Sequence, residues 1–243
     1  MLSAFAWGFL AASSLILGGV FALVWRMPER VLGMIMAFGS GVLISAVAYE
    51  LVQEAFDTSA GDGGVALGLI TGSIAFFAGD RIIDGMGGSD RKSSAGRQVS
   101  GSALAIVLGI VLDGIPESIV LGLTIVGGGG VSAAFLAAVF ISNLPESIAA
   151  TSGLAQAGWS RSRVLGLWTA VAAVSGLAAL AGYGLLESAS ANTVAYVLAF
   201  AGGAILTMLA DTMMPEAFEH GGKLVGVVTT IGFGIAFALS ALD

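Results

Sequence analysis

The sequence predicts an all-α membrane protein with eight transmembrane helices and both termini outside the cytoplasm. Hydrophobic residues make up 57% of the 243 residues and charged residues only 10%, whereas an ordinary soluble domain is about 25% charged. The chain also divides into eight apolar stretches of roughly the 20 residues that a helix needs to cross a bilayer. These stretches are Ala4 to Trp25, Val31 to Ala55, Val65 to Ile83, Ala103 to Val126, Ala133 to Gln156, Val164 to Leu186, Thr193 to Met214 and Leu224 to Leu242.

The cationic residues support this count, because all nine lie in or beside alternate loops. Under the positive-inside rule those loops face the cytoplasm. We therefore expect a multi-pass protein of the plasma membrane, the inner membrane in a prokaryote, with extracytoplasmic termini. The nine cations are Arg26, Arg30, Arg81, Arg91, Lys92, Arg97, Arg161, Arg163 and Lys223.

An internal repeat predicts a 3+2+3 order of helices. The 21 residues from Ala37 align without gaps with those from Ala199, at an offset of 162, and seven positions are identical. These are the second and seventh spans, which cross in opposite directions in the predicted topology. Helices 1–3 and 6–8 would then form an inverted repeat, an architecture that supports alternating access to a substrate near the midplane. Chance similarity between two Ala/Gly-rich helices is the alternative.

The chain is expected to be one transmembrane domain, residues 1–243, with one long polar loop. Gly85 to Gly101 are rich in Gly and Ser, a composition typical of flexible linkers, and we expect this loop to be cytoplasmic. The chain has no Cys, which excludes disulfides and thiolate metal sites. Its net charge of −7, with no basic run, argues against a nucleic-acid partner.

Two Pro-Glu-Ser tripeptides bring carboxylates into the fourth and fifth spans. In the fourth span Asp113 and Glu117 are four residues apart, so they share one face of a helix, and Ser142 and Glu146 repeat this spacing in the fifth span. The two prolines, Pro116 and Pro145, remove helical hydrogen bonds, which makes the carbonyl oxygens of Leu112 and Ile141 available as ligands.

We single out five acidic residues within the spans, and no Lys or Arg lies deep enough to pair with them. They are Glu50, Asp113, Glu117, Glu146 and Asp211. A carboxylate at the bilayer centre costs on the order of 3 kcal/mol by insertion scales, so a divalent cation or protons must balance the charge. We expect a metal site with Asp113, Glu117 and Glu146 as main ligands and Ser142 and Asn143 as auxiliary ligands. The alternative is that the acids are protonated and hydrogen-bonded between helices.

The remaining acids predict a route to that site. Glu50 and Glu54 would line its outer half, and Asp211 and Glu216 its inner half. Because empty carboxylates in a low dielectric favour protonation, metal entry is expected to release protons.

The two motifs IPESIVLGL and SNLPESIAA resemble the paired motifs of the Zrt/Irt-like (ZIP) divalent metal transporters. The likeness covers nearly the whole chain, including the second span and the seventh. It implies uptake of a divalent metal into the cytosol through a site between the fourth and fifth helices, by an elevator-like movement and often in dimers. No nucleic acid or catalytic cofactor is implied, because the metal ion is the substrate.

This chain departs from the ZIP pattern at the metal site. Asp113-Gly114 replaces the usual His-Asn pair, Ser118 and Ser147 replace glycines, and Asp211 stands where the family commonly has a His. The resulting all-oxygen site favours Mn²⁺, Mg²⁺, Ca²⁺ or Fe²⁺ over Zn²⁺ on ligand type, although carboxylates also bind zinc.

Two other functions compete with metal transport. A proton- or sodium-coupled carrier of an organic solute would use the buried acids as coupling sites. An intramembrane aspartyl protease would pair Asp113 with Asp211, but the GxGD signature of that class is absent. We therefore expect a transporter and not an enzyme.

Overall fold

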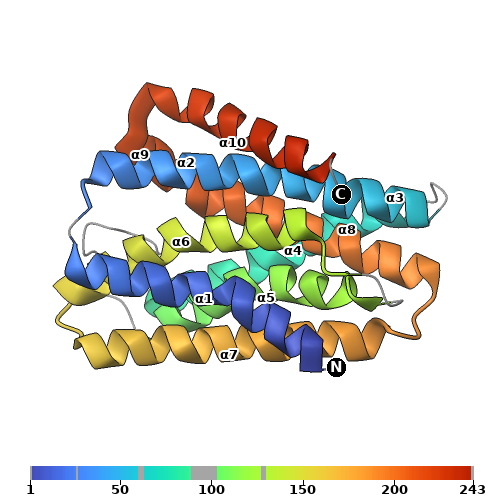
Figure 1. Cartoon of the computed structure of the whole chain (residues 1–243), viewed down its shortest axis with the longest axis horizontal. Helices are drawn as coiled ribbons and strands as arrows, with labels where there is room; N and C mark the ends of the chain where they lie inside the picture. The colour runs from blue at the N-terminus through green and yellow to red at the C-terminus, as the bar shows by residue number, and fades with distance from the viewer. Residues whose placement is uncertain (1, 26, 60–62, 89–102, 127–129, 242–243) are drawn as a thin grey trace.

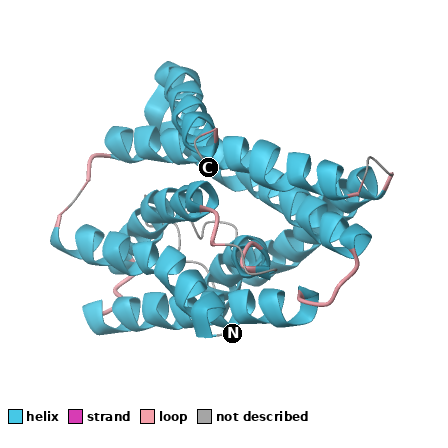
Figure 2. Ribbon diagram, turned by 45° about the vertical axis from the view of Figure 1, so that its right-hand side comes forward, coloured by secondary structure: helices cyan, strands magenta, loops and turns pink. Residues whose placement is uncertain are grey.

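The structure, a computed structural model, describes residues 2–25, 27–59, 63–88, 103–126 and 130–241. Every regular element in these ranges is a helix (Figure 2). The elements are α1 (Leu2–Val24), α2 (Glu29–Ala46), η1 (Val47–Gln53), α3 (Glu54–Thr58), α4 (Gly64–Ile83), η2 (Asp84–Gly88), α5 (Ala103–Leu123), α6 (Ala133–Gln156), α7 (Arg161–Leu186), α8 (Ala191–Met208), η5 (Leu209–Met213), α9 (Met214–Gly221), η6 (Gly222–Leu224) and α10 (Val225–Ser240).

Seven helical runs in the described ranges are long and apolar enough to cross a membrane. The last run, Ala191–Ser240, is folded back on itself. Gly222 within it has φ 65° and ψ −150°, a conformation that glycine adopts far more readily than other residues. Beyond this residue α10 runs back along α2 (Figure 1). The reversal falls between the two separate spans that the sequence predicts in this region, although α10 itself has only 16 residues.

The predicted ends of the helices agree well with the observed ones where polar residues flank the apolar stretch. The predicted span Ala133 to Gln156 coincides with α6. The predicted polar loop does not begin where we expected, because Gly85 to Gly88 still belong to the π-helical turn η2, which contains Gly87 at φ 93°. The rest of that loop, residues 89–101, lies outside the described residues.

Serine side chains begin three of the long helices. Ser132, Ser160 and Ser190 precede α6, α7 and α8, and each hydroxyl oxygen accepts a hydrogen bond from the backbone N–H three residues later, at 3.1, 3.3 and 3.2 Å. Each serine thereby satisfies one of the N–H groups that have no partner in the first helical turn.

The helix bounds repeat at the offset found in the sequence. Adding 162 to the ends of α2, residues 29 and 46, gives residues 191 and 208, the ends of α8. A π-helical segment follows each of them, η1 from Val47 and η5 from Leu209. The two helices run in opposite directions (Figure 1).

Close helix contacts also follow the repeat. Gly41 of α2 meets α10, where an added Cβ would lie 1.9 Å from the carbonyl oxygen of Thr229. Its repeat mate Gly203 of α8 meets α4, where an added Cβ would lie 2.0 Å from the carbonyl oxygen of Leu69. Glycine therefore lets α2 and α8 approach equivalent neighbours more closely than any side chain would allow.

The long helices pack as two groups. In the first group, α1 packs against α6 and α7, and α7 also packs against α5. In the second group, α2 packs against α10 and α4 against α8. The main contact between the two groups joins α2 to α6. Helix α6 thus lies against α2 and α10 of the second group, and α5 of the first group lies against α4 and α8.

The described cations gather at one end of the bundle. Arg30 lies in the first turn of α2, Arg81 in the last turn of α4, Arg161 and Arg163 in the first turn of α7, and Lys223 between α9 and α10. All these points lie at the end opposite to the start of α1 and the finish of α10 (Figure 1). We call it the cationic end, and the other end the terminal end.

Candidate metal site

The predicted ligands lie in the middle of α5 and α6 and are buried. Their exposed fractions are 4% for Asp113, 2% for Glu117, 0% for Ser142, 7% for Asn143 and 8% for Glu146. Helices α5 and α6 contact each other. Three carboxylates and two further oxygen-bearing side chains are therefore removed from solvent in neighbouring helices.

None of the three carboxylates stands alone. Asp113, Glu117 and Glu146 each take part in a polar or electrostatic interaction within the chain. Such interactions are expected, because an isolated ionised carboxylate is strongly disfavoured away from water.

Both helices continue through their prolines. Pro116 lies inside α5 and Pro145 inside α6. Neither ring can donate to the carbonyl four residues earlier, so the backbone oxygens of Leu112 and Ile141 are left without the usual intrahelical donor. These oxygens lie one residue before Asp113 and Ser142, which places them beside the predicted ligands.

The serines of this region bond to their own helices. The hydroxyl of Ser142 donates to the carbonyl of Val139 at 3.0 Å, so its oxygen lone pairs point elsewhere and can bind a cation. Ser118 donates to Gly114 at 2.7 Å and Ser147 to Leu144 at 2.9 Å. Ser118 and Ser147 therefore each have a local hydrogen-bonding role.

Two cavities open on opposite sides of the predicted ligands along α6. At the terminal end, a cavity of about 380 Å³ includes Glu50, Glu54 and Ser132 in its lining. At the cationic end, a cavity of about 520 Å³ includes Glu29, Ser152 and Gln156.

The spacing along α6 puts the predicted ligands between these cavities. Ser142 is ten residues beyond Ser132, or about 15 Å along the helix, and Glu146 is six residues before Ser152, or about 9 Å. The ligands therefore lie between the cavities but belong to neither lining.

Glu50 joins three helices at the terminal end. Its carboxylate accepts hydrogen bonds from Ser132, the residue before α6, at 2.7 Å and from Ser240 at the end of α10. Glu54, the next predicted route residue, is exposed on α3 and accepts a 3.4 Å hydrogen bond from Thr58. Both acids line the cavity in which a cation from that side would first meet carboxylates.

The two acids predicted for the inner half of the route lie apart from each other. Asp211 is exposed and lines a groove between α4 and α8 that also contains Ser73 and Thr207. Glu216 is half-buried on α9 and lies 3.1 Å from the ring of His220. The position of Asp211 gives no support for its expected role in the route, because neither cavity beside α6 includes it.

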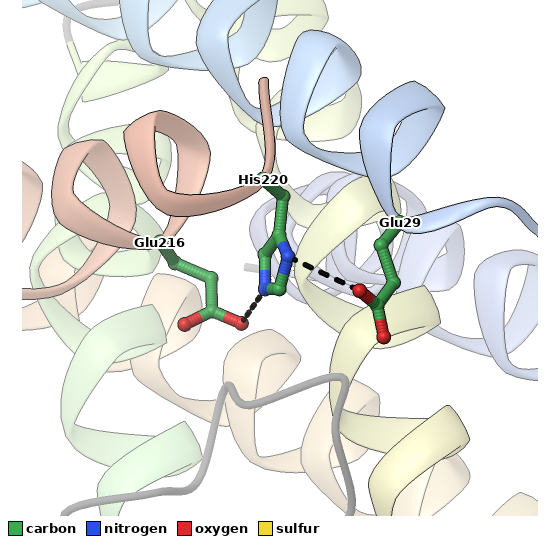
Figure 3. A network of polar contacts seen from close by, with 3 residues as sticks. All are labelled: Glu29, Glu216 and His220. Atoms are coloured by element: carbon green, nitrogen blue, oxygen red, sulfur yellow. Dashed lines mark hydrogen bonds and ion pairs between the residues drawn. The ribbon is translucent and has the colours of Figure 1, made fainter. Parts of the chain in front are cut away.

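The sequence reasoning missed the partners of His220. Glu216 lies beside one ring nitrogen, and Glu29 of α2 lies 3.6 Å from the other (Figure 3). The spacing of four residues between Glu216 and His220 was a usable signal, because such residues are neighbours on a helix. Glu29 left no comparable signal, since it is far away along the chain.

No protein-family profile and no curated protein matches this chain. The resemblance to the ZIP transporters therefore depends on the motif residues themselves.

Proposed function

We propose that this protein carries divalent metal cations across a membrane into the cytosol. The observation that supports this best is the buried set of Asp113, Glu117, Ser142, Asn143 and Glu146 on α5 and α6. Three carboxylates in an apolar bundle favour a doubly charged cation, because its charge offsets the cost of desolvating them. The metal is the substrate, and no resident cofactor is proposed.

The proposed topology has eight spans in a 3+2+3 order, with both termini outside. The reversal at Gly222 supports dividing Ala191–Ser240 into a seventh and an eighth span. The position of Arg30, Arg81, Arg161 and Lys223 at one end supports a cytoplasmic cationic end.

The proposed movement is a sliding of the first helix group against the second. The two groups meet mainly where α2 faces α6, the helix that carries Ser142, Asn143 and Glu146. Gly39 of α2 has no side chain that interlocks with α6 at this contact. An added Cβ there would lie 3.3 Å from the Cα of Ser142. Displacement of α6 toward either cavity would expose the ligands first to one side and then to the other. Glu50 and Glu54 would receive the cation and Glu216 would release it.

The ligand chemistry limits the choice of ion. The five proposed ligands offer only oxygen, which favours hard or borderline cations such as Mn²⁺, Mg²⁺, Ca²⁺ or Fe²⁺ over Zn²⁺. Because the ligands must be deprotonated to bind a metal, uptake should release protons inside the site. Uptake that does not respond to an imposed pH gradient would contradict this coupling.

Metal-dependent thermal stabilisation tests the site. The purified chain is heated with each divalent cation in turn, and one cation should raise its unfolding temperature. A cation at 100 times its dissociation constant adds about 2.7 kcal/mol to the free energy of unfolding. For a hard cation such as Mg²⁺ or Ca²⁺, Glu117→Gln and Glu146→Gln should abolish this gain, whereas Glu187→Gln, at the far end of α7, should keep it.

Uptake into proteoliposomes then tests transport itself. The cation that stabilises the protein should accumulate in vesicles with the native chain and not with Glu117→Gln. Stabilisation by an organic solute and by no divalent metal would favour the solute carrier instead.

A further inference from the structure

A second group of potential metal ligands lies at the cationic end, away from α5 and α6. Glu216, Glu219 and His220 of α9 each offer a ligand atom, and these atoms all lie within 4.8 Å of one another. The side chain of His220 is only 9% exposed and that of Glu216 12%. Glu219 is exposed, so the group lies at the protein surface with its histidine and one carboxylate half-buried.

The histidine ring is held between carboxylates from two different elements (Figure 3). Its Nε2 lies 3.1 Å from Oε1 of Glu216 on α9, and its Nδ1 lies 3.6 Å from Oε2 of Glu29 on α2. A neutral imidazole has one N–H and one lone pair, so it can donate to only one of these two acceptors. The lone pair of the other nitrogen then faces a carboxylate oxygen. The repulsion between them would be relieved by a cation bound between the two atoms.

The arrangement matches that of a metal-binding histidine. Such a ring commonly binds the cation through one nitrogen and gives the N–H of the other to a carboxylate, which fixes its orientation. Here Glu29 occupies the position of the orienting carboxylate, while Glu216 lies on the side of Nε2 and Glu219 offers a ligand atom within 4.8 Å of the other two. Ligand atoms of one zinc ion lie about 3.4 Å apart, so small side-chain rotations would bring the three atoms from within 4.8 Å into range.

We propose that His220, Glu216 and Glu219 form a second divalent-metal site, oriented by Glu29. Because it includes an imidazole nitrogen, it should prefer borderline transition metals such as Zn²⁺ or Co²⁺ to Mg²⁺ or Ca²⁺. Glu29 also lines the 520 Å³ cavity at this end, which gives the site a route to α6. This inference deepens the proposed function, on which it rests, by placing an exit site where metal leaves the protein.

The internal repeat supplies a control within the same chain. At the offset of 162, Glu216, Glu219 and His220 correspond to Glu54, Asp57 and Thr58. Thr58 hydrogen-bonds to Glu54 with the same spacing of four residues, at 3.4 Å. The terminal end therefore has two acids and a hydroxyl where the cationic end has two acids and an imidazole, so only the cationic end should bind a nitrogen-seeking metal tightly.

Nuclear magnetic resonance of the histidine ring tests this site directly, because the chain contains a single His. The full chain, freed of any affinity tag, is labelled with ¹⁵N-histidine and titrated with Zn²⁺ in detergent, with Mg²⁺ as a comparison. Zn²⁺ should shift the Nε2 resonance, and Mg²⁺ at the same concentration should leave it in place. Glu216→Gln and Glu219→Gln should each weaken the apparent affinity by about tenfold or more, whereas Glu54→Gln should leave it unchanged.

A Glu117→Gln background separates this inference from the proposed transport. If the His220 signal still responds to Zn²⁺ in that background, the second site exists whether or not the deep site binds metal. Metal uptake by a native chain whose His220 signal does not respond would refute the second site alone. A response that is equal in the native chain, Glu216→Gln and Glu219→Gln would also refute it, provided that size-exclusion profiles show the variants to be folded.

Discussion

Replacing Gly203 by alanine tests whether glycine contacts hold the second helix group together. The added Cβ would lie 2.0 Å from the carbonyl oxygen of Leu69 on α4. Ordinary contact begins at 3.4 Å, so α4 and α8 would have to separate locally by about 1.4 Å, the difference between the two distances. The obstructing atoms belong to the backbone of Leu69, which cannot rotate away as a side chain would.

The net effect follows from two opposing contributions. Forcing an extra methyl into a packed interior costs typically about 1–3 kcal/mol, and the backbone contact should place this variant toward the upper part of the range. Exchanging glycine for alanine inside a helix returns about 0.5–1 kcal/mol. We expect a net loss of about 1–2 kcal/mol, or a fall of roughly 2–8 °C in the unfolding temperature of a chain of this size.

Intrinsic tryptophan fluorescence in detergent measures this change, since the chain has four Trp, of which Trp168 is buried. Gly41→Ala should give a similar fall, because its Cβ would lie 1.9 Å from the carbonyl oxygen of Thr229. Gly234→Ala is the matched control, because nothing lies within 4 Å of its added Cβ. The reasoning is refuted if Gly203→Ala unfolds at or above the temperature of Gly234→Ala.

Three further substitutions probe the contact between the groups and two side-chain hydrogen bonds. Gly39→Ala should slow metal uptake severalfold with little change in unfolding temperature. In the static fold its Cβ would lie 3.0 Å from the flexible end of Met213 and 3.3 Å from the Cα of Ser142, so shifts of a few tenths of an ångström would accommodate it, but it would obstruct the sliding of α6; unchanged uptake would contradict the proposed movement. Ser132→Ala should lower the unfolding temperature more than Ser190→Ala, because both lose a helix cap worth about 1 kcal/mol and only Ser132 also bonds to a carboxylate; equal falls would argue against that bond. Trp168→Phe should cost about 1 kcal/mol in thermal unfolding, since it removes the 2.7 Å hydrogen bond from the buried indole, and an unchanged temperature would show that this bond contributes nothing.

Much of the helical architecture could be predicted because it depends on local patterns. The length of the apolar stretch predicted α6 from Ala133 to Gln156. The aligned stretches beginning at Ala37 and Ala199 indicated that α2 and α8 are equivalent, and the two helices do begin and end at positions related by the offset of 162. The burial of the predicted ligands on α5 and α6 is also what their mid-span positions indicate. In each case the information lies within one stretch of chain or in a comparison of two.

The contacts between distant segments could not be read in the same way. Glu50 is bonded by Ser132 and Ser240, which come from two other helices, and His220 meets Glu29 across most of the chain. Spacing rules apply within one helix and contain no information on which helices become neighbours. The exposed position of Asp211 shows the same limit, because a polar residue within an apolar run can face either the bundle or its surface.

The π-helical segments η1 and η5 have a consequence for the acids that follow them. A π-helical turn contains about one residue more than an α-helical turn, so it rotates everything after it by roughly the 100° that one residue spans in a helix. Glu54 follows η1 directly, and Glu216 lies three residues after the end of η5. Deleting one residue within Val47–Gln53 would therefore do more than shorten the helix: it would turn Glu54, Asp57 and Thr58 together toward a different neighbour while leaving the preceding α2 untouched. The number of residues in η1 and in η5 therefore determines which neighbours the acids at the terminal end and at the cationic end face.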